Sequence, residues 1–437
     1  MPSPPTAPVI IIGAGIAGLA LAQGLLKLNS HLPIPNRIPF HIYERSSTFS
    51  VRSQGYRLRI NDAGTLALKS IFSPSHFHVL KECSPIYTAR KGMHPAILDA
   101  VTRMETQLPG SASTQRKSED NEFEPMSADR EVLRKVLLKG LENRITYSKD
   151  FSHYEILNAD SDQGRRRGGV KVKVHFTDGS QVLGSLLVGA DGVKSRVRKQ
   201  LLPGPEHAYI DTEQRYFYGK TPLTAHLLDK LHPHICKEIA LVQDRSERYP
   251  LSLVVEPIRF KDGKYREEFE LPGDYVYWVL GARKEFFETS GSRLSDSELL
   301  SLSGEDAMNE TRKLTSTWHP GFRVLFELQD PERVAGLRIV SAKPQLPKWE
   351  AEGKGRVTLI GDSVHAMAPT AAVGAVTALR SAAGLARCLG EGFTEGMLEE
   401  GRLETWEEEM RGFAGEAVER SWFGGKLIFG MKGWEEL

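Results

Sequence analysis

Cysteine is scarce in this chain of 437 residues, and so is net charge. The three cysteines, Cys83, Cys236 and Cys388, lie far apart and form no CxxC pair, which excludes a disulfide framework and a zinc site, so we expect no bound metal. They fit a reducing compartment, so we expect a cytoplasmic protein. The formal net charge of +1 provides no global field for nucleic acid or for an acidic membrane surface.

Long hydrophobic runs are missing as well. No apolar segment reaches the length of a membrane span, so we expect no transmembrane segment. The apolar stretch near the N-terminus has no preceding Lys or Arg and contains four glycines, so a strand–turn–helix explains it better than a secretory leader. The composition, 40% hydrophobic and 26% charged, is that of a globular protein, which we expect to be a monomer or a homodimer.

The first 45 residues predict a βαβ unit. A hydrophobic strand (Val9–Ile12) leads through a glycine turn into a helix that starts at Ile16, and a second strand (Phe40–Tyr43) ends at Glu44. Further on, residues 127–144 have a helical period with one apolar face, and Ser127 or Asp129 is the expected N-cap.

Residues 206–340 have a different texture. Aromatic strands such as LSLVVEPIRF and DYVYWVLGAR alternate with charged turns, which predicts an antiparallel sheet. At GKGRVTLIGD the pattern of the N-terminal region, a hydrophobic strand that ends in a glycine turn, appears again. We therefore predict an α/β fold with a discontinuous Rossmann-like dinucleotide domain (1–80, 123–205 and 335–395). A mostly antiparallel substrate domain (81–122 and 206–334) adjoins it, and a C-terminal helical region (396–437) follows.

The motif Gly13-x-Gly15-x-x-Gly18 stands between the first strand and its helix, which is the context that dinucleotide binding requires. The first glycine allows the tight turn, the second lets the backbone approach a pyrophosphate, and the third lets helix and strand pack closely. Glu44 stands where a carboxylate holds the adenosine ribose, and its charge argues against a ribose 2′-phosphate. NAD and FAD remain open at this point.

Three segments in order resemble the single-component flavoprotein aromatic hydroxylases, the family with the para-hydroxybenzoate hydroxylase fold. They are GAGIAGLALA (13–22), GADGVKSRVR (189–198) and GDSVHAMAPTAAVGA (361–375), with a weaker fourth element in ADREVLRKVLL (128–138). The resemblance implies bound FAD, and NADPH or NADH as a transient co-substrate. No second GxGxxG follows downstream, which favours a nicotinamide that binds only in passing.

The resemblance also implies roles for individual residues. Asp362 hydrogen-bonds FAD hydroxyls, Pro369 packs near the isoalloxazine edge, and the backbone up to Gly374 and Ala375 faces the pyrimidine end of the ring. Arg45 and Arg130 are implied to contact the pyrophosphate or ribityl chain, and Gly55 to Arg57 are implied to line the opposite side of the flavin. The turn at Asp191 is implied to contact both FAD and the nicotinamide.

This sequence departs from the family pattern in three places. Ala372 stands where Gly is usual, Val376 where Asn is usual, and Ser381 where an acid is common. An alanine still fits the close approach if its φ is negative, and Val376 removes a side-chain hydrogen bond. The family pattern makes His365 a structural loop residue rather than a base.

The expected reaction is that of a monooxygenase. NAD(P)H reduces the flavin, O2 forms a C4a-hydroperoxide, and one oxygen atom hydroxylates or epoxidises a small hydrophobic substrate, aromatic or a secondary metabolite. Arg215 and Tyr218, at the entry to the second domain, are the candidate catalytic residues. Two alternatives are a flavin-dependent halogenase, whose WxWxIP signature and catalytic Lys are absent from this sequence, and a non-catalytic flavoprotein-fold binding protein.

Overall fold

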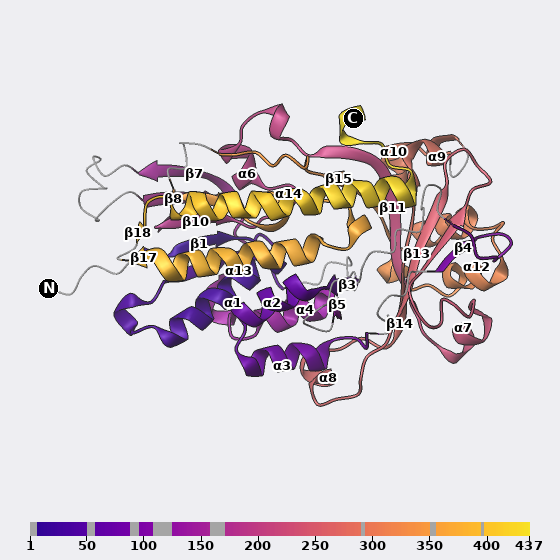
Figure 1. The fold of residues 1–437 in the computed structure, drawn as a ribbon, viewed down its shortest axis with the longest axis horizontal. Helices are drawn as coiled ribbons and strands as arrows, with labels where there is room; N and C mark the ends of the chain where they lie inside the picture. The colour runs from indigo at the N-terminus through magenta and orange to yellow at the C-terminus, as the bar shows by residue number, and fades with distance from the viewer. Residues whose placement is uncertain are drawn as a thin grey trace.

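The computed structural model describes residues 7–49, 57–87, 96–107, 125–157, 171–289, 293–349, 355–394 and 397–437. The molecule is elongated, with a unit built on a parallel sheet at one end and a six-stranded sheet at the other (Figure 1). The long helices α13 (Gly374–Gly392) and α14 (Arg402–Phe429) run side by side along the first unit, and α14 reaches the large sheet.

The parallel sheet has five strands drawn from both ends of the chain. In spatial order they are β16 (Val357–Leu359), β10 (Leu186–Gly189), β1 (Val9–Ile12), β2 (Phe40–Tyr43) and β6 (Ile145–Thr146). Every residue of β1, VIII, is buried, as expected for a strand that is covered on both faces. Because β1, β10 and β16 pair in parallel, their carboxyl ends lie together at one edge of the sheet.

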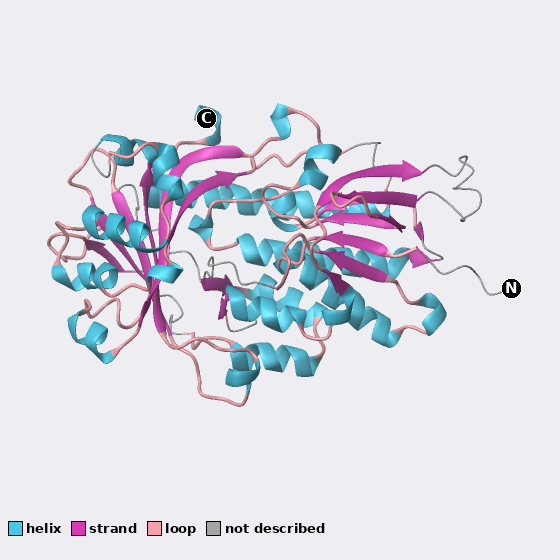
Figure 2. Ribbon diagram, turned by 180° about the vertical axis from the view of Figure 1, so that it is seen from behind, coloured by secondary structure: helices cyan, strands magenta, loops and turns pink. Residues whose placement is uncertain are grey.

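Helices cover one face of this sheet and a small sheet covers the other (Figure 2). The helices are α1 (Ile16–His31), α2 (Asp62–Ile71), α3 (Pro74–Cys83), α4 (Arg130–Leu138) and α13, and α1 packs on α13. The opposite cover is the antiparallel set β7 (Phe151–Leu157), β8 (Lys171–Phe176) and β9 (Gln181–Gly184). A Cβ at Gly184 would lie 2.6 Å from Ile10 Cδ1, so the two sheets touch closely.

The six-stranded sheet is antiparallel except at one edge. Its order is β15 (Ala335–Ser341), β11 (Ile210–Pro222), β14 (Tyr275–Arg283), β13 (Leu251–Ile258), β12 (Ala240–Asp244) and β4 (Ala96–Asp99), and only β12 and β4 run parallel. One face packs in an apolar cluster that includes Phe217, Trp278 and Phe326. The opposite face, with Tyr216, Tyr218 and Val279, packs against Ala368 and residues of α14.

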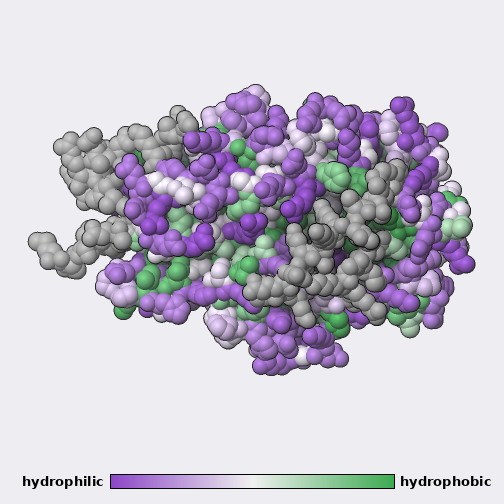
Figure 3. Space-filling model, viewed as in Figure 1, coloured by the Kyte–Doolittle hydropathy of each residue, from purple (hydrophilic) through white to green (hydrophobic). Residues whose placement is uncertain are grey.

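The remaining elements are short. Within the described ranges the helices are α6 (Arg196–Leu201), α7 (Ala225–Lys230), α8 (Tyr265–Glu268), α9 (Lys284–Thr289), α10 (Asp296–Ser301), α11 (Gly304–Leu314) and α12 (Pro320–Glu327). Two strand pairs are β3 (Arg57–Ile60) with β5 (Met126–Asp129) and β17 (Phe393–Thr394) with β18 (Met397–Leu398). The 3₁₀ turns of the same ranges are η1 (Ile34–Asn36), η2 (Glu142–Arg144), η3 (Pro205–His207), η4 (Pro331–Arg333), η5 (Gly361–Ser363), η6 (Pro369–Ala371) and η7 (Trp434–Glu436). The face drawn in Figure 3 is mostly hydrophilic, with apolar residues in small separate groups.

The predicted α/β class and the strands β1 and β2 are confirmed, and so is the antiparallel sheet of the second region. The helix expected over 127–144 begins only at Arg130, because residues 126–129 pair with β3 as strand β5. Its N-cap is Asp129, whose Oδ1 accepts the N–H of Glu131 at 2.8 Å. The domain limits stay a prediction. Among the described residues, no helix combines the length and the apolarity needed to cross a membrane.

Candidate active site

The glycine turn after β1 is shaped by contacts that only glycine permits. Gly13 has a φ of +108°, and a Cβ there would lie 2.4 Å from the carbonyl oxygen of Ala190. A Cβ at Gly18 would lie 2.0 Å from the carbonyl oxygen of Gly13. Gly15, the N-cap of α1, differs: the nearest atom to a Cβ there is the oxygen of Ala190, 4.0 Å away. Outside its chain neighbours, no other atom of the described residues lies within 4 Å of a Cβ placed on Gly15, so the helix N-terminus there leaves room for a phosphate.

Glu44 holds the glycine turn from the neighbouring strand. Its carboxylate accepts the N–H of Ala14 at 2.8 Å and that of Ser46 at 3.0 Å. Burial favours protonation, but these hydrogen bonds and the charge of Arg134 outweigh it, so the pKa of Glu44 lies below its usual range. Glu44 is therefore an ionised acceptor beside the N-terminus of α1, where the ribose of a dinucleotide is expected.

Arg134 of α4 contacts this turn, and the sequence analysis did not single it out. It donates to the carbonyl oxygen of Ala14 at 3.2 Å and lies 4.5 Å from the ring centre of Phe49. Its place one helical turn after Arg130 on α4 was a usable signal, since residues i and i+4 share a helix face. Arg130, the first residue of α4, acts on Asp362 through its charge. Arg45 is exposed just after Glu44, and Gly55 lies outside the described residues.

Asp191 follows β10 at the same sheet edge. Its Oδ2 accepts the N–H of Arg196 at 2.8 Å and that of Val197 at 3.3 Å, so it holds the first turn of α6, whose N-cap is Ser195. Oδ1 is buried and has no hydrogen-bond partner among the described residues, and burial raises the pKa of this carboxyl. An unpaired buried acceptor is costly, so Oδ1 is a fitting acceptor for a ligand hydroxyl.

Asp362 follows β16 in the turn η5. Gly361 before it has a φ of +64°, and a Cβ there would lie 2.6 Å from Ala17 Cβ, which fixes the turn against α1. The side chain of Asp362 is accessible, yet burial raises its pKa against the opposing charge of Arg130. The Tyr209 hydroxyl donates to the carbonyl oxygen of Asp362 at 2.9 Å.

His365 is buried and structural. Its Nε2 lies 3.3 Å from Ser381 Oγ, which also accepts the N–H of Gly361 at 3.4 Å. Burial lowers the pKa of His365 to about 4, so the imidazole is neutral at physiological pH. The serine in place of the family's acid therefore links His365 to the turn before Asp362.

The loop before α13 corrects one expectation. Ala372 has a φ of +53°, in the left-handed region, where a negative value was expected. Pro369 is exposed at the start of η6, and Gly374 and Ala375 form the first turn of α13, which contains no acidic residue. The backbone N–H groups of a helix of 19 residues therefore begin at this loop, and they favour negative charge.

Arg215 and Tyr218 do not meet, because they point to opposite faces of β11. The Arg215 guanidinium is buried and donates to Asp211 Oδ1 at 2.8 Å and to Asp296. Burial disfavours its charge, but the two carboxylates outweigh this and raise the pKa of Arg215. This ion cluster faces away from the loop at Ala368, so a catalytic role for Arg215 is withdrawn. Tyr218 lies in one apolar cluster with Ala368 and Met367.

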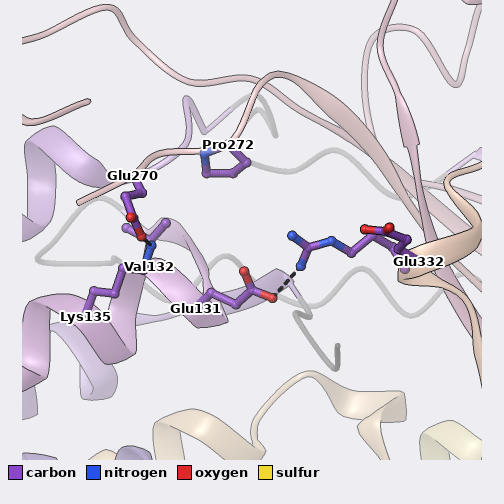
Figure 4. Close-up of a pocket in the computed structure, with 7 residues that line it drawn as sticks. Glu131, Val132, Lys135, Glu270, Pro272 and Glu332 are labelled. Carbon is purple, nitrogen blue, oxygen red and sulfur yellow. Dashed lines mark hydrogen bonds and ion pairs between the residues drawn. The ribbon is translucent and has the colours of Figure 1, made fainter. Parts of the chain in front are cut away.

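A polar cleft of about 410 Å³ lies between α4 and the second unit (Figure 4). Two ion pairs cross it, Glu131 to Arg333 at 2.8 Å and Lys135 to Glu270 at 2.5 Å. Four of its five charged side chains are paired with each other, so these ion pairs join α4 to the second unit.

Known proteins resemble the whole chain. A family model described as an FAD binding domain matches residues 349–421. The dual O-methyltransferase/FAD-dependent monooxygenase elcB of Phaeosphaeria nodorum is 34% identical over 468 residues, which cover 98% of this chain and 47% of that protein. The chain thus spans about half the length of this relative.

Two further likenesses extend over most of both chains. The FAD-dependent monooxygenase dbaB of Emericella nidulans is 27% identical over 369 residues, 83% of this chain and 81% of that protein. A solved structure assigned as an FAD-containing monooxygenase from Photorhabdus luminescens matches with a TM-score of 0.74 at 26% identity. That match covers 97% of this chain and 99% of the other.

Proposed function

The chain belongs to the FAD-dependent monooxygenases with the para-hydroxybenzoate hydroxylase fold, and from this we propose that it uses NAD(P)H and O2 to hydroxylate or epoxidise a small hydrophobic substrate, aromatic or a secondary metabolite. The observation that carries the proposal is that the N-terminus of α1 at Gly15 and the turn with Asp362 lie at the same edge of the parallel sheet, where Gly361 packs against Ala17 of α1. Both ends of the chain meet there, as an extended dinucleotide requires.

The residues at this edge of the sheet fit FAD. The N-terminus of α1 would take the pyrophosphate, Glu44 the adenosine ribose, and Asp362 a hydroxyl of the chain toward the ring. The N-terminus of α13 at Gly374 would face the pyrimidine end, where its dipole favours negative charge. When bound, FAD supplies the activation of oxygen, and the protein supplies orientation and the exclusion of water.

The face of the large sheet opposite the loop 366–375 would form the substrate wall. Tyr218, Tyr277 and Val254 lie there in one apolar cluster with Met367. Such a wall accepts a flat hydrophobic molecule and excludes water from the space above the flavin. The activity of the whole protein and its partners belong to the same proposal, because the chain spans only part of elcB.

The test begins with the colour of the purified protein. We expect a bound flavin spectrum, and oxidation of NADH or NADPH that is stimulated by members of a panel of phenols, indoles and terpenoids, with one oxygen atom added to the product. A protein that stays colourless after addition of FAD contradicts the proposal and supports a binding protein. Halide-dependent chlorination of the product supports a halogenase instead.

A further inference from the structure

Two histidines and a glutamate form a cluster on the outer face of the small sheet. They are His153 and Glu155 of β7 and His175 of β8. Each offers one atom that can bind a metal, and these three atoms all lie within 4.8 Å of one another. The small sheet lies at the end of the molecule away from the six-stranded sheet (Figure 1). The cluster is therefore separate from the residues that we assign to FAD and to the substrate.

An irregularity in the strand pairing brings the two histidines opposite each other. Phe151 of β7 pairs with Phe176 of β8, and the next pair is His153 with His175, so β7 contains one extra residue between these pairs. In regular pairing Ser152 would stand opposite His175 instead. A β-bulge of this kind redirects the side chains that follow it. The two imidazole rings are stacked as a result, with centres 4.2 Å apart and planes inclined by 9°.

Glu155 adds a carboxylate to the stacked pair. It lies two residues after His153 on β7 and so points to the same face of the sheet. Its Oε1 lies 3.1 Å from His175 Nε2 and 4.0 Å from His153 Nε2. Bonds of about 2.0–2.1 Å to a tetrahedral Zn²⁺ ion place its ligand atoms about 3.3 Å apart. Small movements of the side chains would therefore bring all three groups onto one ion.

Both imidazoles have a nitrogen available for such an ion. His175 Nε2 is buried and has no hydrogen-bond partner across the ranges that the structure describes, although Glu155 Oε1 is close. A buried polar atom without a partner is costly, and a metal ion would remove this cost. His153 Nδ1 lies 3.1 Å from Ser152 Oγ. When Nδ1 carries the proton and donates it to Ser152, Nε2 presents its lone pair, as in metal ligands whose second nitrogen is held by an outer partner.

The exposure of the cluster lets an ion reach it from solvent. The side chains of His153 and Glu155 are 51% and 48% exposed, whereas that of His175 is 13% exposed. An ion bound here would therefore keep water at its remaining position. Two imidazoles and one carboxylate are a set of ligands that suits Zn²⁺, whereas Mg²⁺ and Ca²⁺ prefer oxygen ligands alone.

We propose that His153, Glu155 and His175 bind one Zn²⁺ ion, which joins β7 to β8. The expectation of no bound metal rests on cysteine ligands alone, and this set needs none. Tyr154 of β7 donates its N–H to Gln200 Oε1 at 2.9 Å and accepts from Gln200 Nε2 at 2.8 Å, so the ion would also steady the contact between β7 and α6. The inference goes beyond the proposed function and does not depend on it.

The test measures Zn²⁺ binding by the full chain as purified, without a histidine tag and after dialysis against a chelator. Calorimetric titration with ZnCl₂ in the presence of excess Mg²⁺ should show one saturable site per chain. Zn²⁺ should also raise the melting temperature of the wild type, because an ion that binds only the folded state stabilises it.

Single substitutions locate the site. His153→Ala, Glu155→Gln and His175→Ala should each raise the dissociation constant for Zn²⁺ at least about 10-fold, since loss of an outer partner alone costs about that much. Each should also abolish the rise in melting temperature. His207→Ala is the matched control, because His207 lies 3.5 Å from Glu206 outside the cluster. It should bind Zn²⁺ as the wild type does.

Two results would overturn the inference. One is a wild type without a saturable Zn²⁺ site, or with a site from which Mg²⁺ displaces the ion. The other is Zn²⁺ binding of unchanged strength in the three variants, which would place the ion elsewhere on the chain. If His175→Ala does not fold, the exposed positions decide through His153→Ala and Glu155→Gln. Uptake of FAD plays no part in these outcomes, so a failure here leaves the proposed function standing.

Discussion

Ser421 of α14 donates its hydroxyl to the carbonyl oxygen of Ala368 at 2.5 Å. In return, the Thr370 hydroxyl donates to the Ser421 carbonyl oxygen, also at 2.5 Å. One turn further along α14, a Cβ at Gly424 would lie 3.2 Å from the carbonyl oxygen of Thr370. The C-terminal helix thus holds the loop that precedes α13, where the flavin ring is expected.

Ser421→Ala should loosen this loop without disturbing the glycine turn. Loss of one buried hydrogen bond is worth about 1 kcal/mol, or roughly a fivefold rise in the dissociation constant for FAD. A shift in the reduction potential of the bound flavin should accompany it, since the loop leads into the N-terminus of α13. Ser301→Ala, on the exposed helix α10, is the matched control. If the affinity for FAD and the reduction potential of the flavin were unchanged, Ser421 would not hold the loop before α13 in place.

Asp362→Asn should change binding and stability in opposite directions. Its folded-state pKa is raised, so the folded protein binds more protons than the unfolded chain and loses stability as pH rises through this range. Removing the charge should therefore raise the melting temperature of the FAD-free protein at neutral pH and weaken its affinity for FAD. Calorimetry and flavin titration check the two signs. Asp229→Asn, exposed on α7, should alter neither.

Ala372→Gly should be tolerated, or should stabilise the protein by up to about 1 kcal/mol. The left-handed backbone strains an alanine by about 1–2 kcal/mol, and glycine relieves this strain. Glycine also raises the entropy of the unfolded chain, which offsets part of the gain. The neighbouring Ala371→Gly should have the opposite sign, because Ala371 lies in η6 without a positive φ. Denaturant unfolding of both variants decides the matter, and equal losses would contradict the assigned strain.

Acid should destabilise the fold through His365. Its folded-state pKa is about 4 against an ordinary value of 6.5, so the unfolded chain binds the extra proton between these values. The stability is complete above about pH 6.5 and falls as pH decreases, by roughly 3 kcal/mol near pH 4. In His365→Gln this contribution to the pH dependence of unfolding should vanish. A parallel pH profile in the variant would disprove it.

The sequence predicted the parts of the site that depend on local backbone chemistry. The positions of Gly13, Gly18 and Glu44 could be predicted, because a tight turn and the end of a strand restrict the residue types that are allowed there. The role of Ser421 could not be predicted, because its partner is 53 residues away and no periodicity links them. Arg215 misled for a related reason: its ion partner Asp296 is 81 residues away, and only the structure shows which face of β11 it occupies.

The parallel sheet has a consequence for synthesis. Its central strand β1 is made first, but β16 pairs with β10 only after residue 359 has been added. Gly13 and Gly374 are separated by 361 positions. At the usual rate of translation, the start of α13 is therefore synthesised on the order of half a minute after the N-terminal glycine turn. During this interval the exposed edge of β10 is open to wrong pairing. Early supply of FAD should not shorten the wait, because the N-terminus of α13, where we expect the flavin ring to bind, does not yet exist.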